Sequence, residues 1–148
     1  MAMPMLDTFD GPNLPARRRG NFVNAAVIVA NRDRQVSLDA KLQQIIAARS
    51  DRAKYFPEDM FADPAWDILL ELALAEQLQH RVSVTSLCVG SRVPQTTALR
   101  WIKHMTDLGW LVRRNDPLDA RRSFIELSKD TSERMRAYLL SVDPAAAV

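Results

Sequence analysis

The stretch from Ser83 to Leu127 constrains the fold more than any other part of the sequence, because helical and strand patterns follow one another there in a fixed order. Two short helical patterns come first, at Thr85–Gly90 and Pro94–Leu108, and the small polar pair Ser91-Arg92 separates them. A Gly-Trp pair then ends the second helix, and two β-type runs surround a polar, basic tip: Leu111–Arg114, Ser123–Leu127 and Asn115–Arg122. The order helix, turn, helix, two-stranded ribbon predicts a winged helix-turn-helix, mainly α with a small antiparallel β wing.

The second helical pattern carries side chains suited to reading DNA. A helical projection places five apolar residues on one face, which we expect in the core: Ala98, Trp101, Ile102, Met105 and Leu108. The outward face holds six candidate DNA-binding residues: Gln95, Thr96, Thr97, Arg100, Lys103 and His104. Arg100 can bond bidentately to guanine and Gln95 to adenine, while threonine methyl groups can pack on thymine. We therefore expect helix 94–108 to read the major groove; an ordinary solvated surface is the alternative.

The ribbon tip is the second candidate contact with DNA. Gly109 is placed to end the preceding helix in the left-handed conformation. The next three residues are expected to return to the core: Trp110, Leu111 and Val112. Asp119 stands two residues before Arg121, so its carboxylate can hold the arginine and order the tip. Arg121 and Arg122 are then candidate contacts with the minor groove or the DNA backbone from a wing at residues 115–123.

The segment before residue 37 is expected to be a largely disordered or weakly structured extension. Met1–Gly20 is rich in Pro, Gly and Arg without periodicity, and its Arg17–Arg19 run is either a basic arm for phosphates or a solvated tail. Phe22–Ala30 is short, apolar and β-branched toward its end, a pattern that does not separate strand from buried helix, and we lean to a strand or extended segment.

A winged-helix domain with flanking helices is expected over residues 37–148, with its core at 64–128. Ser37 is a candidate N-cap for an amphipathic helix that runs to about Tyr55 and either forms a dimer element or covers its own core. Asp63-Pro64 is a strong helix start, and the apolar residues that follow predict a central buried helix ending near Gln79.

Smaller elements complete the domain. Val82–Val84 can pair with the ribbon as a third strand, and Thr85 or Ser86 can cap the helix that follows. Three residues of that helix are expected to face inward or nearly so: Leu87, Cys88 and Val89. A last helix is expected at Ser132–Ser141.

Charge is distributed unevenly along the chain. Phe56–Gln79 contains six acidic residues and no Lys or Arg, whereas His80–Arg122 contains eight basic residues against three acidic ones. The two segments therefore carry −6 and +5, so that a polyanion such as DNA would be attracted to one face and repelled by the other.

Catalytic, metal and membrane chemistry finds little support in the sequence. His80, His104 and Cys88 stand on different elements without zinc-ligand spacing, and no P-loop, G-x-G-x-x-G or G-x-S-x-G motif is present. We therefore expect no enzyme, cofactor or metal.

With a single cysteine no internal disulfide can form, which fits a cytoplasmic location. Cys88 is either a redox sensor or, more simply, a small buried residue. No apolar run is long enough to span a membrane, and the Arg17–Ala30 region lacks the cleavage site of a secretory signal.

Residues at the end of the second helix and in the wing resemble the MarR family of bacterial transcription regulators. The family's D-x-R hallmark falls on Asp119 and Arg121 within Asp116–Ser128, and its GW(L/V)-x-R pattern falls on Gly109–Arg113. The resemblance covers about residues 64–140 and implies a dimeric regulator of transcription. In such a regulator the helix beginning at Pro94 would read the major groove, and Arg121, oriented by Asp119, would enter the minor groove.

The chain departs from this family at its ends. Only residues 129–148 remain where family members usually carry a long C-terminal dimerisation arm, so dimerisation could move to the Ser37–Tyr55 helix. The family also implies a possible small-molecule effector, whose pocket the sequence does not identify. A different class of function, a winged-helix module that binds a protein partner through the acidic Phe56–Gln79 segment, is the alternative to sequence-specific DNA binding.

Overall fold

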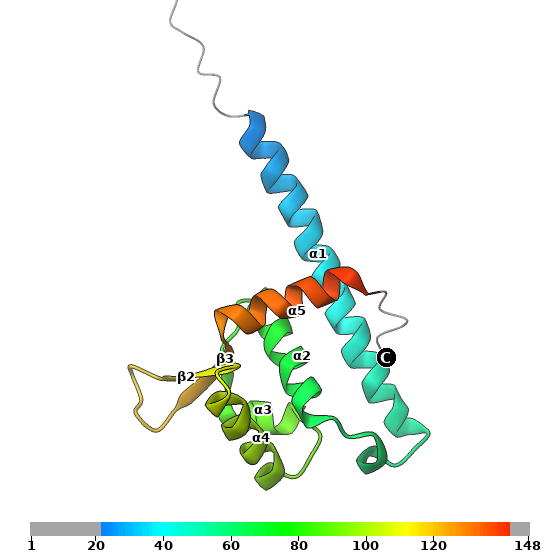
Figure 1. The fold of residues 1–148 in the computed structure, drawn as a ribbon, viewed down its shortest axis with the longest axis vertical. Coiled ribbons are helices and arrows are strands. Elements are labelled where there is room, and N and C mark those ends of the chain that lie inside the picture. Colours follow the sequence, from blue (N-terminus) through cyan, green and yellow to red (C-terminus); the bar gives the residue numbers. More distant parts are fainter. Residues whose placement is uncertain (1–21, 143–148) are drawn as a thin grey trace, which may run out of the picture.

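The structure, a computed structural model, describes residues 22–142, and from residue 37 onward it also describes every side chain in that range. Five α-helices, two 3-10 turns and three strands follow one another in the order α1 (Phe22–Asp51), η1 (Arg52–Lys54), η2 (Glu58–Phe61), α2 (Pro64–Gln77), β1 (Val82–Ser83), α3 (Val84–Gly90), α4 (Gln95–Asp107), β2 (Leu111–Asn115), β3 (Ser123–Leu127) and α5 (Lys129–Ser141). The predicted fold class, mainly α with a small antiparallel wing, is confirmed (Figure 1).

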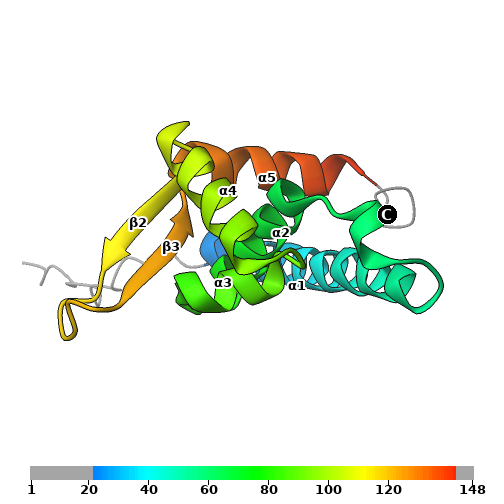
Figure 2. The ribbon, with the colours of Figure 1, turned by 90° about the horizontal axis from the view of Figure 1, so that it is seen from below.

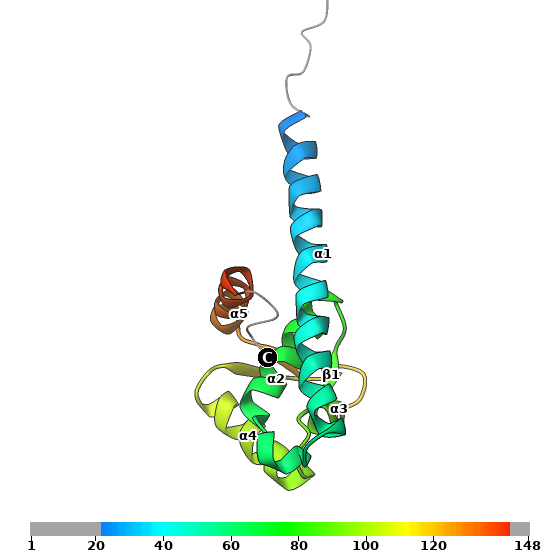
Figure 3. The same ribbon diagram turned by 90° about the vertical axis from the view of Figure 1, so that its right-hand side faces the viewer.

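Helix α1 corrects the expectation for the N-terminal extension. The Phe22–Ala30 segment, expected as strand or extended, is the first part of one continuous helix that passes residue 37 without interruption. Ser37 is therefore an interior residue and not an N-cap. At 1.5 Å per residue, 30 helical residues span about 45 Å. The first half of α1 extends beyond the remaining helices, as Figures 1 and 3 show. Residues 1–21, including the Arg17–Arg19 run, lie outside the described part of the chain.

The Phe22–Ala30 segment is helical although its β-branched residues favour strands, because strand propensity is only a weak preference. The three-stranded sheet has the order β1-β3-β2, and the Phe22–Ala30 segment pairs with none of its strands. The β-branched residues of the segment cost helix stability only slightly, and beyond its first turn a helix pairs the backbone groups locally. The other end of α1 is also earlier than predicted: it stops at Asp51, and Tyr55 is 79% exposed.

The second half of α1 buries its apolar face against its own chain. Leu38, Leu42 and Ile45 are almost completely buried in a cluster with residues of α2 and α5: Leu70, Ala73, Met135 and Leu139. Two roles were considered for this helix, forming a dimer element and covering its own core, and the packing of Leu38, Leu42 and Ile45 shows the second. Their face is therefore not available to a second copy of the chain.

A second cluster joins α2 to the helix-turn-helix and the sheet. It comprises Ile68, Leu72, Leu87, Cys88, Ala98, Ile102, Met105, Leu111 and Ile125. Helix α2 contributes to both clusters, as expected of a central buried helix. The molecule therefore has two lobes on either side of α2: an α1/α5 lobe and a lobe made of α3, α4 and the wing.

Side-chain caps explain where three of the helices begin. Asp63 Oδ1 accepts a hydrogen bond from the Trp66 backbone N–H at 3.3 Å, and Pro64 occupies the first helical position, as predicted. Helix α3 is capped by Ser83, which accepts from Ser86 N, and not by Thr85 or Ser86. Ser128 caps α5 in the same way through Thr131 N, so this helix begins at Lys129 and not at Ser132.

The sheet has the predicted third strand. Val82 of β1 and Arg113 of β2 both pair with Ile125 of the central strand β3. Ile125 is buried, which fixes the register of the wing on the lobe.

None of the helices in residues 22–142 is long and apolar enough to cross a membrane.

Candidate nucleic-acid interface

Helix α4 presents a polar face outward from its lobe. Ala98, Ile102 and Met105 are buried on the inner side and anchor the helix to α2, α3 and the sheet. Five of the six predicted contact residues are exposed, and Thr97 is half-buried: Gln95, Thr96, Arg100, Lys103 and His104. Seen from below, α3 and α4 lie between the wing and the connection from α1 to α2 (Figure 2). The helix is therefore packed by one face and exposed on the other.

The buried stripe of α4 is narrower than the sequence predicted. Trp101 and Leu108, both expected in the core, are 37% and 52% exposed. With 100° between successive residues, both lie about 60° or more from the centre of the stripe formed by Ala98, Ile102 and Met105. The Trp101 ring instead packs edge-on against His104, with ring centroids 6.0 Å apart. Val89 on α3 was likewise expected to face inward or nearly so, and it is 78% exposed.

A shallow hollow of about 520 Å³ runs along the outer face of α4. Four predicted contact residues line it: Thr97, Arg100, Lys103 and His104. Trp101 and Asp107, which were not predicted as DNA contacts, complete the lining. Lys103 Nζ lies 2.7 Å from Asp107 Oδ2 in an exposed ion pair one helical turn apart. The i, i+4 spacing of this pair is readable in the sequence. Asp107 therefore offsets Lys103, whereas the Arg100 guanidinium has no ion-pair partner among residues 22–142.

The wing tip is a compact turn held by hydrogen bonds that backbone N–H groups donate. Asp116 N donates to Arg122 O at 3.0 Å and closes the loop, while Leu118 N donates to Asp116 Oδ1 at 2.9 Å. Arg121 and Arg122 are exposed, and in the described part of the chain neither guanidinium forms an ion pair. The tip thus carries two unpaired positive charges on an ordered turn.

Asp119 orders the tip by a different contact from the one expected. Its Oδ1 accepts from the Arg121 backbone N–H at 3.0 Å, and its carbonyl accepts from Arg122 N at 3.0 Å. The carboxylate therefore fixes the backbone of the turn and leaves the Arg121 guanidinium free. An Asx turn of this kind competes well with a side-chain ion pair because it closes a short, local ring.

The strands behind the tip hold further basic residues. Arg113 Nε donates to Ser123 Oγ at 3.0 Å, and Arg114 Nε lies 3.4 Å from Glu126 Oε2. Arg81, beside β1, places its guanidinium 5.4 Å from the centroid of the Phe124 ring. These contacts join the strands of the ribbon and its neighbour β1, so the basic residues of the wing stand on paired strands.

The region where α4 meets the wing departs from the sequence expectation at one residue. Gly109 ends α4 with φ +74°, as predicted, and Leu111 is buried. Trp110, however, is 37% exposed, because it lines an apolar hollow of about 210 Å³ instead of entering the core. The other walls come from α2 and α5, and they include Trp66, Leu69, Met135 and Tyr138.

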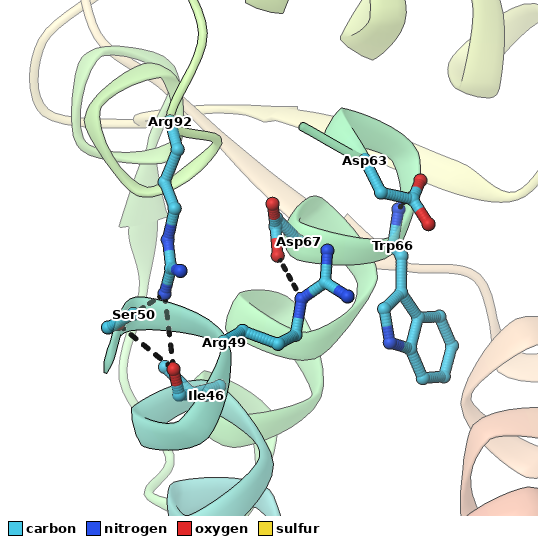
Figure 4. A network of polar contacts seen from close by, with 7 residues as sticks. All are labelled: Ile46, Arg49, Ser50, Asp63, Trp66, Asp67 and Arg92. Carbon is cyan, nitrogen blue, oxygen red and sulfur yellow. Dashed lines mark hydrogen bonds and ion pairs between the residues drawn. The ribbon is translucent and has the colours of Figure 1, made fainter. Parts of the chain in front are cut away.

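Two of the charges counted along the sequence are bonded to α1 or buried. Asp67, one of the six acidic residues in Phe56–Gln79, is buried and bonded to Arg49 of α1. Arg92, one of the eight basic residues in His80–Arg122, is bonded to α1 and does not extend freely from the turn (Figure 4). Counting along the sequence cannot find such pairs, because their partners lie 18 to 46 residues away.

The described residues hold no metal-ligating cluster, and their cysteine is unreactive in character. No group of three metal-ligating side chains converges in residues 22–142. Cys88 is buried, and desolvation raises the pKa of its thiol, which disfavours the reactive thiolate.

Comparison with known proteins gives similar structures only. No protein-family model matches the chain, and no curated protein matches it. NadR in complex with 4-hydroxyphenylacetate is 16% identical with a TM-score of 0.45, covering 86% of this chain and 79% of NadR. A mutant of MepR from S. aureus is 14% identical to this chain, with a TM-score of 0.47. The match covers 83% of this chain and 76% of MepR. Sco3205, a MarR family transcriptional regulator from Streptomyces coelicolor solved in complex with DNA, is 21% identical to this chain, with a TM-score of 0.44. The match covers 88% of this chain and 74% of Sco3205. Since each TM-score is below 0.5, none of these likenesses decides what this chain binds.

Proposed function

We propose that this chain is a sequence-specific DNA-binding transcriptional regulator of the MarR-like type, acting as a homodimer in the bacterial cytoplasm. One observation carries the proposal: a rigid helix with an exposed polar face and a wing with two unpaired arginines belong to the same lobe. Winged-helix proteins that bind DNA use these two elements together. The D-x-R and GW-x-x-R residue patterns of this chain, at Asp119–Arg121 and Gly109–Arg113, agree with the proposal.

Helix α4 is the element we assign to the major groove. Arg100 is its strongest candidate for base recognition, because its guanidinium is exposed, has no ion-pair partner in residues 22–142, and has the fork geometry that fits guanine O6 and N7. Gln95 and Thr96, at the start of the helix, can contact bases or phosphates. Lys103 is the weaker candidate, since Asp107 already holds its ammonium group.

The wing supplies contacts that place the protein on the duplex. Arg121 and Arg122 stand on a turn whose backbone is ordered by Asp119, so little backbone conformational entropy is lost when they meet phosphates or the minor groove. A narrow minor groove has an enhanced negative potential that attracts arginine. We assign these two residues to affinity more than to base recognition.

A homodimer is the finer part of the proposal. Since the Leu38–Ile45 face of α1 is covered by its own chain, the part of α1 before residue 37, which extends beyond the other helices, is the candidate contact together with the exposed side of α5. Two copies related by a two-fold axis would read an inverted repeat, with half-sites about one helical turn apart or a multiple of it.

Selection of duplexes from a random-sequence pool tests the proposal. The chain is expected to enrich an inverted repeat and to bind it much more tightly than random duplex, with affinity that falls steeply as salt rises. The mass of the free protein and of the complex gives the stoichiometry. Binding without any enriched sequence would reduce the proposal to nonspecific DNA binding, and no binding by folded protein would contradict it.

A protein-interaction module is the second candidate, and one observation favours it. The connection between α1 and α2 exposes four large apolar side chains next to Glu58 and Asp59: Tyr55, Phe56, Met60 and Phe61. Exposed apolar clusters with a polar rim are typical of protein contacts. Under this function the wing arginines have no role, so replacing Arg121 and Arg122 by Ala would leave partner binding intact.

A further inference from the structure

Arg92 forms a direct connection between the helix-turn-helix and α1. It lies in the turn between α3 and α4, and its Nη2 donates to Ile46 O at 3.2 Å and to Ser50 Oγ at 2.5 Å (Figure 4). Ser50 Oγ also donates to Ile46 O at 2.9 Å. The guanidinium therefore meets the last turns of α1, at the helix end whose dipole favours a positive charge.

The backbone at Arg92 indicates that its side chain matters. Its φ is +56°, in the left-handed region that glycine adopts without strain and other residues adopt at a cost. A turn that needed only this conformation would be served by glycine. Observed strain of this kind supports a functional hypothesis when the surrounding contacts explain it, and here the guanidinium contacts with α1 do so.

The two ends of this connection belong to different lobes. Helix α1 packs mainly on α2 and α5, whereas α3 and α4 pack on α2 and the sheet. The lobes share α2 as a common wall, so their relative orientation depends on α2 and on contacts that bypass it. Arg92 is such a contact, and it holds the turn that immediately precedes α4.

The neighbouring charges favour this arrangement. Arg49 and Asp67 form a buried pair between α1 and α2 close to the same place (Figure 4). Glu71 of α2 faces Arg92 and Asp67: burial raises its pKa, the nearby Arg92 lowers it, and Asp67 raises it. The positive guanidinium thus binds carbonyl and hydroxyl acceptors of α1 and interacts electrostatically with a carboxyl group of α2.

We infer that Arg92 is a positioning residue for DNA recognition: it fixes the turn before α4 against the end of α1, so that the position of α1 is transmitted to the reading helix. The inference rests on the proposed function and adds a role for a basic residue that does not touch DNA. Because its guanidinium is bound to α1, Arg92 is not free to contact a phosphate.

The test replaces Arg92 by Gly in the full chain and measures affinity for the selected duplex and for random duplex by fluorescence anisotropy. Arg92→Gly removes the connection and at the same time relieves the strained φ, so the thermal midpoint should stay close to that of the wild type. Affinity for the selected duplex should fall by about three- to thirtyfold, the range typical of residues that couple two sites. Affinity for random duplex should change much less.

Gln79→Gly is the matched control. Gln79 has φ +54° at the end of α2, so this variant relieves the same kind of strain without breaking a contact to α1. Its affinity should equal that of the wild type. Ser50→Ala, which keeps Arg92 and removes only one of its acceptors, should lose affinity in the same direction but by less.

The salt dependence separates positioning from contact. Arg92→Gly should keep the wild-type slope of affinity against salt, since it removes no phosphate contact. A slope lower by about one unit would identify Arg92 as a phosphate contact and overturn the inference. Equal affinity of Arg92→Gly and wild type would also overturn it, as would a fall in affinity that follows a matching fall in thermal midpoint. If the folded wild type binds no duplex, the proposed function itself fails, and the inference fails with it.

Discussion

Arg49 of α1 donates through Nε to Asp67 Oδ1 of α2 at 2.6 Å, and the two side chains are only 8% and 5% exposed. The pair lies where the α1/α5 lobe meets the lobe that carries α4, close to Arg92 (Figure 4). Removing one partner of a buried ion pair leaves an uncompensated charge in a medium of low dielectric constant, whereas each exposed pair of this chain is screened by water. This contact should therefore stabilise the junction of the lobes.

Asp67→Ala should lower the free energy of unfolding by about 3–5 kcal/mol, because the Arg49 guanidinium would remain buried without a partner. Urea unfolding followed by circular dichroism measures this difference. Asp107→Ala is the control, since it breaks the exposed pair with Lys103 and should cost no more than about 1 kcal/mol. Equal effects of the two variants would show that the Arg49–Asp67 pair does not act as a buried pair.

Glu71 should make the stability of the chain depend on pH. Burial raises its pKa in the folded state above the ordinary value of 4.5. The stability that comes from protonating Glu71 in the folded state is therefore fully present below about pH 4.5. It is lost as the pH rises through the raised pKa of the folded state. Glu71→Gln should be more stable than the wild type at pH 7 and equal to it at pH 4, as measured by thermal unfolding. A constant difference at both pH values would argue against this origin.

Elements with strong local signals were predictable from the sequence. Asp63-Pro64 starts α2 through a side-chain cap and a proline, which act within one turn of helix. Gly109 ends α4 because glycine adopts φ +74° without strain. The strands of the wing follow from their period of two and from Ile125, whose burial fixes the register. In each case the signal and its physical cause lie within a few residues.

Features that depend on distant residues were not predictable. The short, β-branched pattern of Phe22–Ala30 does not separate strand from buried helix and favours an extended segment only slightly, whereas its helical state follows from continuity with the rest of α1. Trp110 was expected in the core, and its partial exposure depends on the hollow that α2 and α5 form around it. The bonds of Arg92 to α1 join residues 42 and 46 positions apart, which no local pattern shows.

Gly109→Ala should destabilise the chain by about 1–2 kcal/mol, because alanine is strained at a positive φ. A Cβ at this position would meet nothing within 4 Å, so the cost comes from the backbone alone. Gly90→Ala is the contrasting variant: its Cβ would lie 3.1 Å from Glu71 Cγ, a flexible side chain that can shift. Chemical unfolding should place Gly90→Ala within about 0.5 kcal/mol of the wild type, and the opposite ranking would contradict the account.

Asp119 should act on DNA affinity through the backbone of the wing tip. Asp119→Asn keeps an oxygen that can accept from Arg121 N, so its affinity for the selected duplex should stay close to that of the wild type. Asp119→Ala loses this acceptor and should bind about three- to tenfold more weakly, as the tip must then be ordered on binding. Thermal midpoints should be unchanged in both. A loss in Asp119→Asn as large as in Asp119→Ala would instead indicate an ion pair between the Asp119 carboxylate and the Arg121 guanidinium.

The assignment of α4 as the reading helix is tested most directly by the affinity of Arg100→Ala for selected and random duplexes, measured by fluorescence anisotropy at two salt concentrations. Lys54→Ala, which removes an exposed lysine of η1, controls for the loss of one positive charge. We expect Arg100→Ala to lose about 1–3 kcal/mol on the selected duplex and to retain nearly all of its affinity for random duplex, while Lys54→Ala changes neither. If Arg100→Ala keeps the full preference for the selected duplex, α4 does not read the sequence through Arg100, and the central claim is contradicted.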